Sequence, residues 1–272
     1  MKRFCFFFAS RDLYFMRMAT KSIDEIQLAI ICSSHAEASA VSARMTGGRA
    51  AHLGLFPGTI GLFSGIPAAL IVSGGDEMQM HAAMLQASFL FDLKYALNFG
   101  TAVALREDLK AGDLAIIREC VRSYCPPALA DNMLDDDSLI FPSDAIRDAI
   151  LSAPSLQSSA SMLNPAFKAL NGHQQPHTLV QREILQVRLG SSDKPLCAHL
   201  GREYVRKRFG VDAQDSGSYG FFRAAQECGC PALSLKVITS SCGNDQGVDA
   251  TKVLKTGAEC LEVAINACQK AV

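Results

Sequence analysis

Residues 93–117 read LKYALNFGTAVALREDLKAGDLAII, and this stretch decides the fold. Its apolar run at 95–99 leads into a small-residue turn, Gly-Thr-Ala at 100–102, and a charged loop then leads to a second apolar run at 113–117. A strand of this kind exposes backbone N–H groups at its carboxyl end, which is where ligands bind in open α/β sheets. The stretch therefore predicts a buried strand that ends at a ligand site.

Other apolar runs of strand length alternate with helical patterns along the chain. Residues 26–32 predict a buried parallel strand, and Ser33-Ser34 can cap the helix that follows it. Residues 60–63 and 68–72 flank a turn and predict a β-hairpin. Further helices are predicted at 76–91, 196–209, 219–229 and 247–271, and further strands at 178–189 and 232–239. The alternation favours an α/β fold with a mixed sheet.

Composition excludes several classes of function. The 272 residues carry 26 Lys and Arg against 27 Asp and Glu, so the chain lacks the basic stripe expected of a nucleic-acid or anionic-membrane protein. No run reaches the roughly 18 apolar residues of a membrane span. The ten cysteines contain no Cys-x-x-Cys pair, which favours reduced thiols over a metal site. We expect a cytoplasmic protein without metal or cofactor.

Two segments stand apart from the predicted domain at 23–272. Residues 1–22 begin with two cations and a short aromatic run, and are interpreted as a disordered extension or a mis-called start rather than a signal peptide. Residues 118–180 hold several prolines, three consecutive aspartates and a serine-rich patch, with one predicted helix at 143–151. Long irregular insertions of this kind are either active-site covers or disorder.

Four stretches, in this order, resemble the nucleoside phosphorylase and nucleosidase family, which cleaves ribosyl N-glycosidic bonds. They are IQLAIICSSHAEASAV at 26–41, Ser73-Gly74-Gly75, LNFGTAVALREDLKAGDLAII at 97–117, and GSYGFFRAAQECGCPALSLKVITS at 217–240. The resemblance runs from about residue 26 to 272, with 118–180 poorly matched. It implies a single three-layer α/β domain with a central mixed sheet flanked by helices, and a homo-oligomer, a dimer in our prediction.

Within this family the sequence is most similar to methylthioadenosine/S-adenosylhomocysteine nucleosidases, which use water rather than phosphate. Asn98 stands where the phosphorylases carry an Arg for phosphate, so the bidentate clamp is missing. Glu37 stands where the hydrolases carry the carboxylate that activates water. Glycine-rich turns after strands suit the binding of a ligand by backbone N–H groups. The candidate substrate-binding residues are therefore Ser73 and Gly74 in one turn, Gly100, Thr101 and Ala102 in the other, and Asn98 just before it.

The sequence departs from the family pattern at its carboxyl-terminal motifs. Gly217 stands where the nucleosidases carry the Glu that binds the ribose hydroxyls, and Ser240, after Thr239, stands where they carry the Asp that protonates the purine. Asp215 occupies the first acidic position of that motif and could restore the ribose contact if the loop is shifted by two residues, and Asp212 is a more remote substitute. Loss of a general acid costs on the order of 10²–10⁴-fold in rate.

Three hypotheses follow, each with a small nucleoside as partner. The first is a hydrolase of a purine nucleoside or thionucleoside, with Glu37 activating water and Asp215 and Ser240 as further catalytic candidates, and with Gly217 and Thr239 near the substrate. The second is a catalytically impaired member that binds a nucleoside or related metabolite. The third is a phosphorylase with a rearranged phosphate site. A purely structural alternative for Glu37 is a first-turn acid that complements the helix dipole.

Overall fold

The computed structural model describes residues 26–123, 138–140, 185–193, 199–240 and 249–271. The N-terminal extension at 1–22, the helix predicted at 143–151 and most of the irregular insertion lie outside these ranges. Within them the strands form one mixed sheet, which confirms the predicted α/β class.

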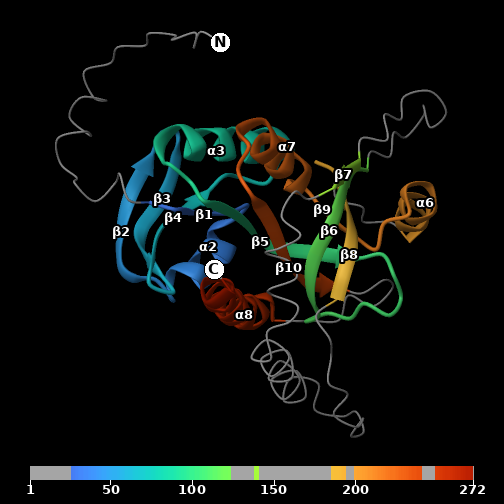
Figure 1. The fold of residues 1–272 in the computed structure, drawn as a ribbon. Helices are drawn as coiled ribbons and strands as arrows, with labels where there is room; N and C mark the ends of the chain where they lie inside the picture. The colour runs from blue at the N-terminus through green and yellow to red at the C-terminus, as the bar shows by residue number, and fades with distance from the viewer. Residues whose placement is uncertain (1–25, 124–137, 141–184, 194–198, 241–248, 272) are drawn as a thin grey trace, which may run out of the picture.

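Three parallel strands form the centre of the sheet (Figure 1). Strand β1 (Leu28–Cys32) lies between β4 (Ile66–Val72) and β5 (Tyr95–Ala104). All five residues of β1 are buried, as a continuous apolar run predicts for a strand covered on both faces. Strand β1 ends at Cys32, one residue after the pair Ile31–Asn98, whereas β5 continues to Ala104. The turn predicted at 100–102 is therefore wrong: Gly100, Thr101 and Ala102 are strand residues, because they pair with β10. Ser33 and Glu37, which follow β1, lie beside this part of β5.

An antiparallel extension continues the sheet beyond β4. Strand β3 (Phe56–Phe63) pairs with β4 through the predicted hairpin, and its two-residue turn at Ser64 and Gly65 has positive φ at both positions, 52° and 77°. Strand β2 (Thr46–Leu53) forms the edge and was not predicted. Its first residues, TGGR, have the composition of a turn, and pairing with β3 rather than local preference makes them extended.

The other half of the sheet closes on itself. The pairings run from β5 to β9, β8, β6 and β10, and β10 returns to β5. The bounds of these strands are β6 (Leu114–Arg122), β8 (Leu185–Ser191), β9 (Ala213–Asp215) and β10 (Ala232–Ser240), and β7 (Ser138–Ile140) pairs with β6. This arrangement brings Ser218, at the start of α7, to Asn98 in β5, to which its hydroxyl donates at 2.8 Å.

Helices cover the two faces of the central strands, so the domain has the three layers predicted (Figure 1). Helices α3 and α7 pack together on one face, and α2 and α8 pack together on the other. The bounds are α2 (His35–Ser42), α3 (Glu77–Leu90), α6 (His199–Phe209), α7 (Ser218–Cys228) and α8 (Ala250–Ala271). No helix in the described ranges is long and apolar enough to cross a membrane.

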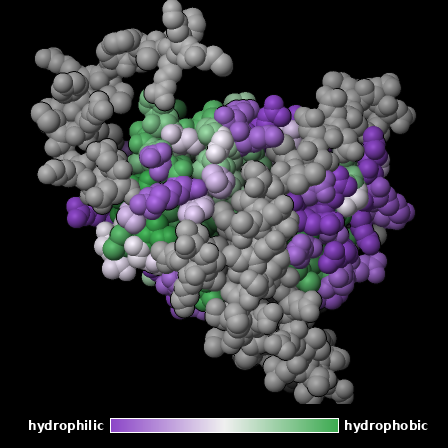
Figure 2. All heavy atoms as spheres, viewed as in Figure 1, coloured by the Kyte–Doolittle hydropathy of each residue, from purple (hydrophilic) through white to green (hydrophobic). Residues whose placement is uncertain are grey.

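The surface differs between the two ends of the sheet. Hydrophobic residues gather over β2, β3 and α3, whereas the surface around α6 is hydrophilic (Figure 2). Leu55, between β2 and β3, and Phe89, in α3, are exposed, and the last turn of α6 carries Arg206, Lys207 and Arg208. The ligand cavity described next lies between these ends.

Candidate active site

The Glu37 carboxylate is held by five hydrogen-bond donors at the end of β1. Its Oε2 atom accepts from the backbone N–H of Ser33 at 2.9 Å, from the Ser33 hydroxyl at 2.6 Å and from the N–H of Ser34 at 3.0 Å. Its Oε1 atom accepts from the N–H of Thr101 at 2.9 Å and from the Thr101 hydroxyl at 3.2 Å. The side chain is therefore both a helix cap, in a capping box with Ser34, and a link from β1 to β5.

Gly100 allows β5 to approach this carboxylate. A Cβ atom at position 100 would lie 2.7 Å from Glu37 Oε1 and 3.0 Å from its carboxyl carbon. Any side chain there would push the carboxylate off the Thr101 N–H. Gly100 was predicted to lie in a turn, but it lies within β5, and the Glu37 carboxylate from another element is what requires a small residue there.

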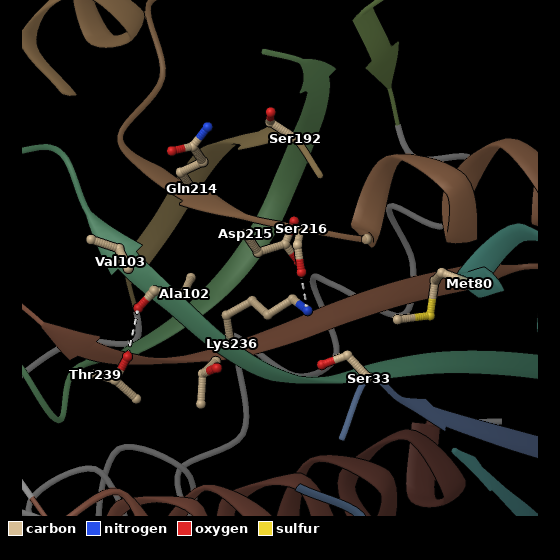
Figure 3. A pocket seen from close by; sticks show the side chains of 12 residues that line it. Ser33, Met80, Ala102, Val103, Ser192, Gln214, Asp215, Ser216, Lys236 and Thr239 are labelled. Atoms are coloured by element: carbon tan, nitrogen blue, oxygen red, sulfur yellow. Dashed lines mark hydrogen bonds and ion pairs between the residues drawn. The ribbon is translucent and has the colours of Figure 1, made fainter. Parts of the chain in front are cut away.

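A cavity of about 230 Å³ opens at the carboxyl ends of these strands (Figure 3). Hydroxyl groups dominate its polar lining, together with one amide, one carboxylate and one ammonium. The lining residues are Ser33, Met80, Thr101, Ala102, Val103, Ser192, Gln214, Asp215, Ser216, Gly217, Lys236 and Thr239. Glu37, only 2% exposed, is not among them, so its carboxylate lies behind the hydroxyls of Ser33 and Thr101.

The predicted site residues fall into two groups. Five of them line the cavity: Thr101, Ala102, Asp215, Gly217 and Thr239. The others lie behind its wall or beside it: Glu37, Ser73, Gly74, Asn98, Gly100 and Ser240. The Ser73 hydroxyl lies 3.1 Å from the carbonyl of Cys32 and 2.9 Å from that of Gly74 and can donate to either, so it fixes the turn after β4. Ser240 pairs with Val103 at the irregular end of β10.

Asn98 belongs to a buried polar network under the cavity. Its side chain is fully buried, its amide donates to the carbonyl of Ile31 at 3.0 Å, and its Oδ1 accepts from the hydroxyls of Ser218 and Ser234 at 2.8 and 2.9 Å. These contacts connect β5 to β1, α7 and β10. Asn98 therefore positions the strands that carry the site.

Lys236 was missed by the sequence analysis, although it is the lone cation in the apolar run 232–239. Its ammonium lies 2.8 Å from Asp215 Oδ2, and the two side chains are 3% and 6% exposed. Figure 3 shows the ammonium extending from β10 between Asp215 and Ser33. Because a charged residue in a buried strand needs a partner of opposite charge, the sequence could have predicted that Lys236 pairs with an acidic residue.

The charges of Glu37 and Lys236 both affect the pKa of the buried Cys32 thiol. Burial raises its pKa well above the ordinary value, the negative charge of Glu37 raises it further, and the Lys236 ammonium opposes both effects. Cys32 is accordingly a protonated, buried thiol beside the site rather than a nucleophile. Among the described residues no three His, Cys, Asp or Glu side chains gather as a metal ion would require.

The fold and the strand-end cavity define an α/β protein of the nucleoside-phosphorylase type. A family model described as the Phosphorylase superfamily matches residues 27–272. The chain belongs to that superfamily. No relative with significant sequence similarity was found among curated proteins.

Solved structures share this fold at low sequence identity. The 5'-methylthioadenosine/S-adenosyl homocysteine nucleosidase of Campylobacter jejuni superposes with a TM-score of 0.69 at 13% identity, over 90% of this chain and 99% of that one. The corresponding nucleosidase of Neisseria meningitidis, in complex with methylthio-immucillin-A, gives 0.66 at 18% identity over 91% and 100%. The futalosine hydrolase of Helicobacter pylori, as a mutant, gives 0.65 at 13% identity over 90% and 99%.

Proposed function

We propose that this protein is a nucleosidase-like hydrolase that cleaves the N-glycosidic bond of a purine nucleoside or thionucleoside with water. The observation that carries the proposal is the Glu37 carboxylate, held by Ser33, Ser34 and Thr101 directly behind the hydroxyls that line the cavity. A carboxylate fixed at a strand end is a suitable base for activating water. The similar solved structures include two nucleosidases and a futalosine hydrolase, which supports the same reaction class.

In the proposed reaction water attacks the anomeric carbon of the sugar. The new C–O bond forms as the C–N bond breaks, and the electron pair of the C–N bond leaves with the base. The proton of the attacking water passes to the Ser33 hydroxyl while that hydroxyl gives its own proton to Glu37 Oε2, 2.6 Å away. The departing base takes a proton from solvent, because position 240 carries a serine hydroxyl and not a carboxylic acid.

Two observations argue against phosphate as the nucleophile. Asn98, at the position of the phosphorylase Arg, is fully buried and bound to Ile31, Ser218 and Ser234, so it does not reach the cavity. The carboxylates of Glu37 and Asp215 also outnumber the Lys236 ammonium at this site, which opposes binding of an anion.

A second candidate function is binding without cleavage. It is favoured by the loss of side-chain function at Gly217 and by Asp215, whose carboxylate is bonded to Lys236 and Ser218. In that case the cavity would hold a nucleoside and the reaction would stop there.

The test is chromatography of the purified protein with methylthioadenosine, S-adenosylhomocysteine, adenosine, inosine and uridine, with and without phosphate. Hydrolysis predicts free purine base without phosphate, and loss of that product in Glu37→Gln. Glu107→Gln, a change of the same kind at an exposed residue, is the matched control and should retain activity. Base release only with phosphate would contradict the proposal. A raised melting temperature without base release would favour the binding function.

A further inference from the structure

The buried pair of Lys236 and Asp215 lies on the wall of the cavity, where the sugar of a bound nucleoside would lie if the proposed function holds. Lys236 projects from β10, and Asp215 ends β9 just before α7 (Figure 3). Both residues line the cavity, together with Ser33, Ser216 and Gly217. The pair therefore lies between Ser33, which binds the Glu37 carboxylate, and Gly217, which precedes α7.

The carboxylate of Asp215 is occupied on both oxygens. Oδ2 accepts from the Lys236 ammonium and shares the single Ser218 hydroxyl proton with Asn98 Oδ1, and Oδ1 accepts from the Ser218 N–H at 3.3 Å. Asp215 thus caps the first turn of α7 and holds Lys236. A carboxylate with these partners is poorly placed to accept hydrogen bonds from a sugar as well.

Position 217 does not supply the missing acceptor. A Cβ atom at Gly217 would lie 3.2 Å from Met80 Cε and 3.4 Å from Met80 Cβ, so Met80 fills the space beside it. The acceptor of sugar hydroxyls that the family resemblance places here is thus absent, and Met80 lines the cavity instead.

The ammonium of Lys236 keeps hydrogen-bonding capacity towards the cavity. It has three N–H donors and no acceptor. In the part of the chain that the structure describes, Asp215 is its one partner, and the side chain is 3% exposed. Donors buried to this degree require partners, so two of the three remain for a ligand.

The charges around Lys236 select a neutral ligand group. Two carboxylates, Glu37 and Asp215, adjoin one ammonium, so the site has no surplus positive charge for a phosphate or carboxylate. A hydroxyl oxygen can accept from the ammonium without adding charge. We propose that Lys236 binds the sugar hydroxyl oxygens of the nucleoside as a donor, with Asp215 as its positioning residue, in place of the acceptor expected at Gly217.

The test is a double-mutant cycle between protein and ligand. The probes are a carbon-linked, uncleavable analogue of adenosine and its 2'-deoxy and 3'-deoxy forms, with dissociation constants measured by calorimetry. The proteins are wild type, Asp215→Asn and Asp215→Asn/Lys236→Met. The last two differ only at position 236, and in both of them residue 215 is a neutral amide that cannot pair with a charge. Lys255→Met, the same change at an exposed residue of α8, is the control.

Removing the hydroxyl that Lys236 binds should weaken binding to the wild type roughly 10- to 100-fold, as expected for a hydrogen bond to a charged group. The loss should be smaller in Asp215→Asn, because the amide no longer holds the ammonium in place. In Asp215→Asn/Lys236→Met the deoxy and parent analogues should bind within about twofold of each other. An equal loss in all variants, or no binding of the parent analogue to the wild type, would overturn the inference. Coupling without any base release would overturn only the proposed hydrolysis.

Discussion

The two sides of the cavity differ in how closely they follow the family pattern. On the β1–β5 side, Glu37 is surrounded by donors from Ser33, Ser34 and Thr101, and Gly100 leaves room for it. On the β9–β10 side, Gly217 and Ser240 replace two carboxyl groups of the pattern, and the Lys236–Asp215 pair occupies the wall. In the proposed function, the residues that would activate water therefore belong to one side of the cavity, and the residues that would bind the sugar and expel the base belong to the other.

The largest expected effect comes from the leaving group. With a serine at 240, an ordinary purine departs without acid assistance, whereas an N7-methylated purine already carries positive charge and needs none. We expect kcat/KM for 7-methylguanosine to exceed that for guanosine by about 10²–10⁴-fold, the usual contribution of a general acid. Initial rates of base release measure the ratio. Equal rates would mean that another group on the β9–β10 side donates the proton.

Breaking the ion pair tests the energetic weight of the β9–β10 side. Lys236→Met leaves the Asp215 carboxylate buried without its cation, and removing one partner of such a pair costs about 3–5 kcal/mol. Urea denaturation should show this loss as a lower midpoint. Asp215→Asn/Lys236→Met, which removes both charges, should recover most of it. A single variant as stable as the wild type would show that the pair does not hold α7 to β10.

The β1–β5 side is probed by adding one methyl group. Gly100→Ala places a Cβ 2.7 Å from Glu37 Oε1, and overpacking of this kind costs about 1–3 kcal/mol. Base release should fall as well, because the carboxylate is displaced from Thr101. Gly75→Ala is the matched control, since no atom lies within 4 Å of its Cβ and its φ is not positive. Similar behaviour of the two variants would refute the close approach at Gly100.

The smallest effect is expected from one hydroxyl. Thr101→Val keeps the shape of the side chain and the backbone N–H donor but removes the 3.2 Å hydrogen bond to Glu37 Oε1. The free energy of unfolding should fall by about 1 kcal/mol. Thermal or urea denaturation measures it. A loss of unfolding free energy as large as that of Lys236→Met would mean that the Thr101 hydroxyl, and not the N–H groups, determines the position of the Glu37 carboxylate.

Local patterns were sufficient to predict the central strands, the β3–β4 hairpin and most helices. Each of these has an apolar run or a turn of its own, as in IQLAIIC at 26–32 or Ser64-Gly65. Strand β9, three residues long, exists because β5 and β8 pair with it, so its sequence alone does not define it. The same reason hides the Lys236–Asp215 contact, which depends on how β9 and β10 are placed across the ring.

The site was predicted in part for the same reason. The residue types at Glu37, Gly100 and Thr101 were recognisable from their order in the chain, and the structure brings these three together. That Glu37 lies behind hydroxyls and that Asn98 joins four elements depend on side-chain packing between distant segments. These contacts join residues that are far apart in the chain, so no local pattern of the sequence reveals them.

The central claim is that Glu37, behind Ser33 and Thr101, activates water for attack on the sugar. The most direct measurement is cleavage of adenosine and methylthioadenosine in ¹⁸O-labelled water without phosphate, followed by mass spectrometry of the sugar. We expect one ¹⁸O atom at the anomeric position with the wild type, and no labelled sugar with Glu37→Gln. Unlabelled sugar phosphate formed only when phosphate is added, or labelling unchanged by Glu37→Gln, would contradict it.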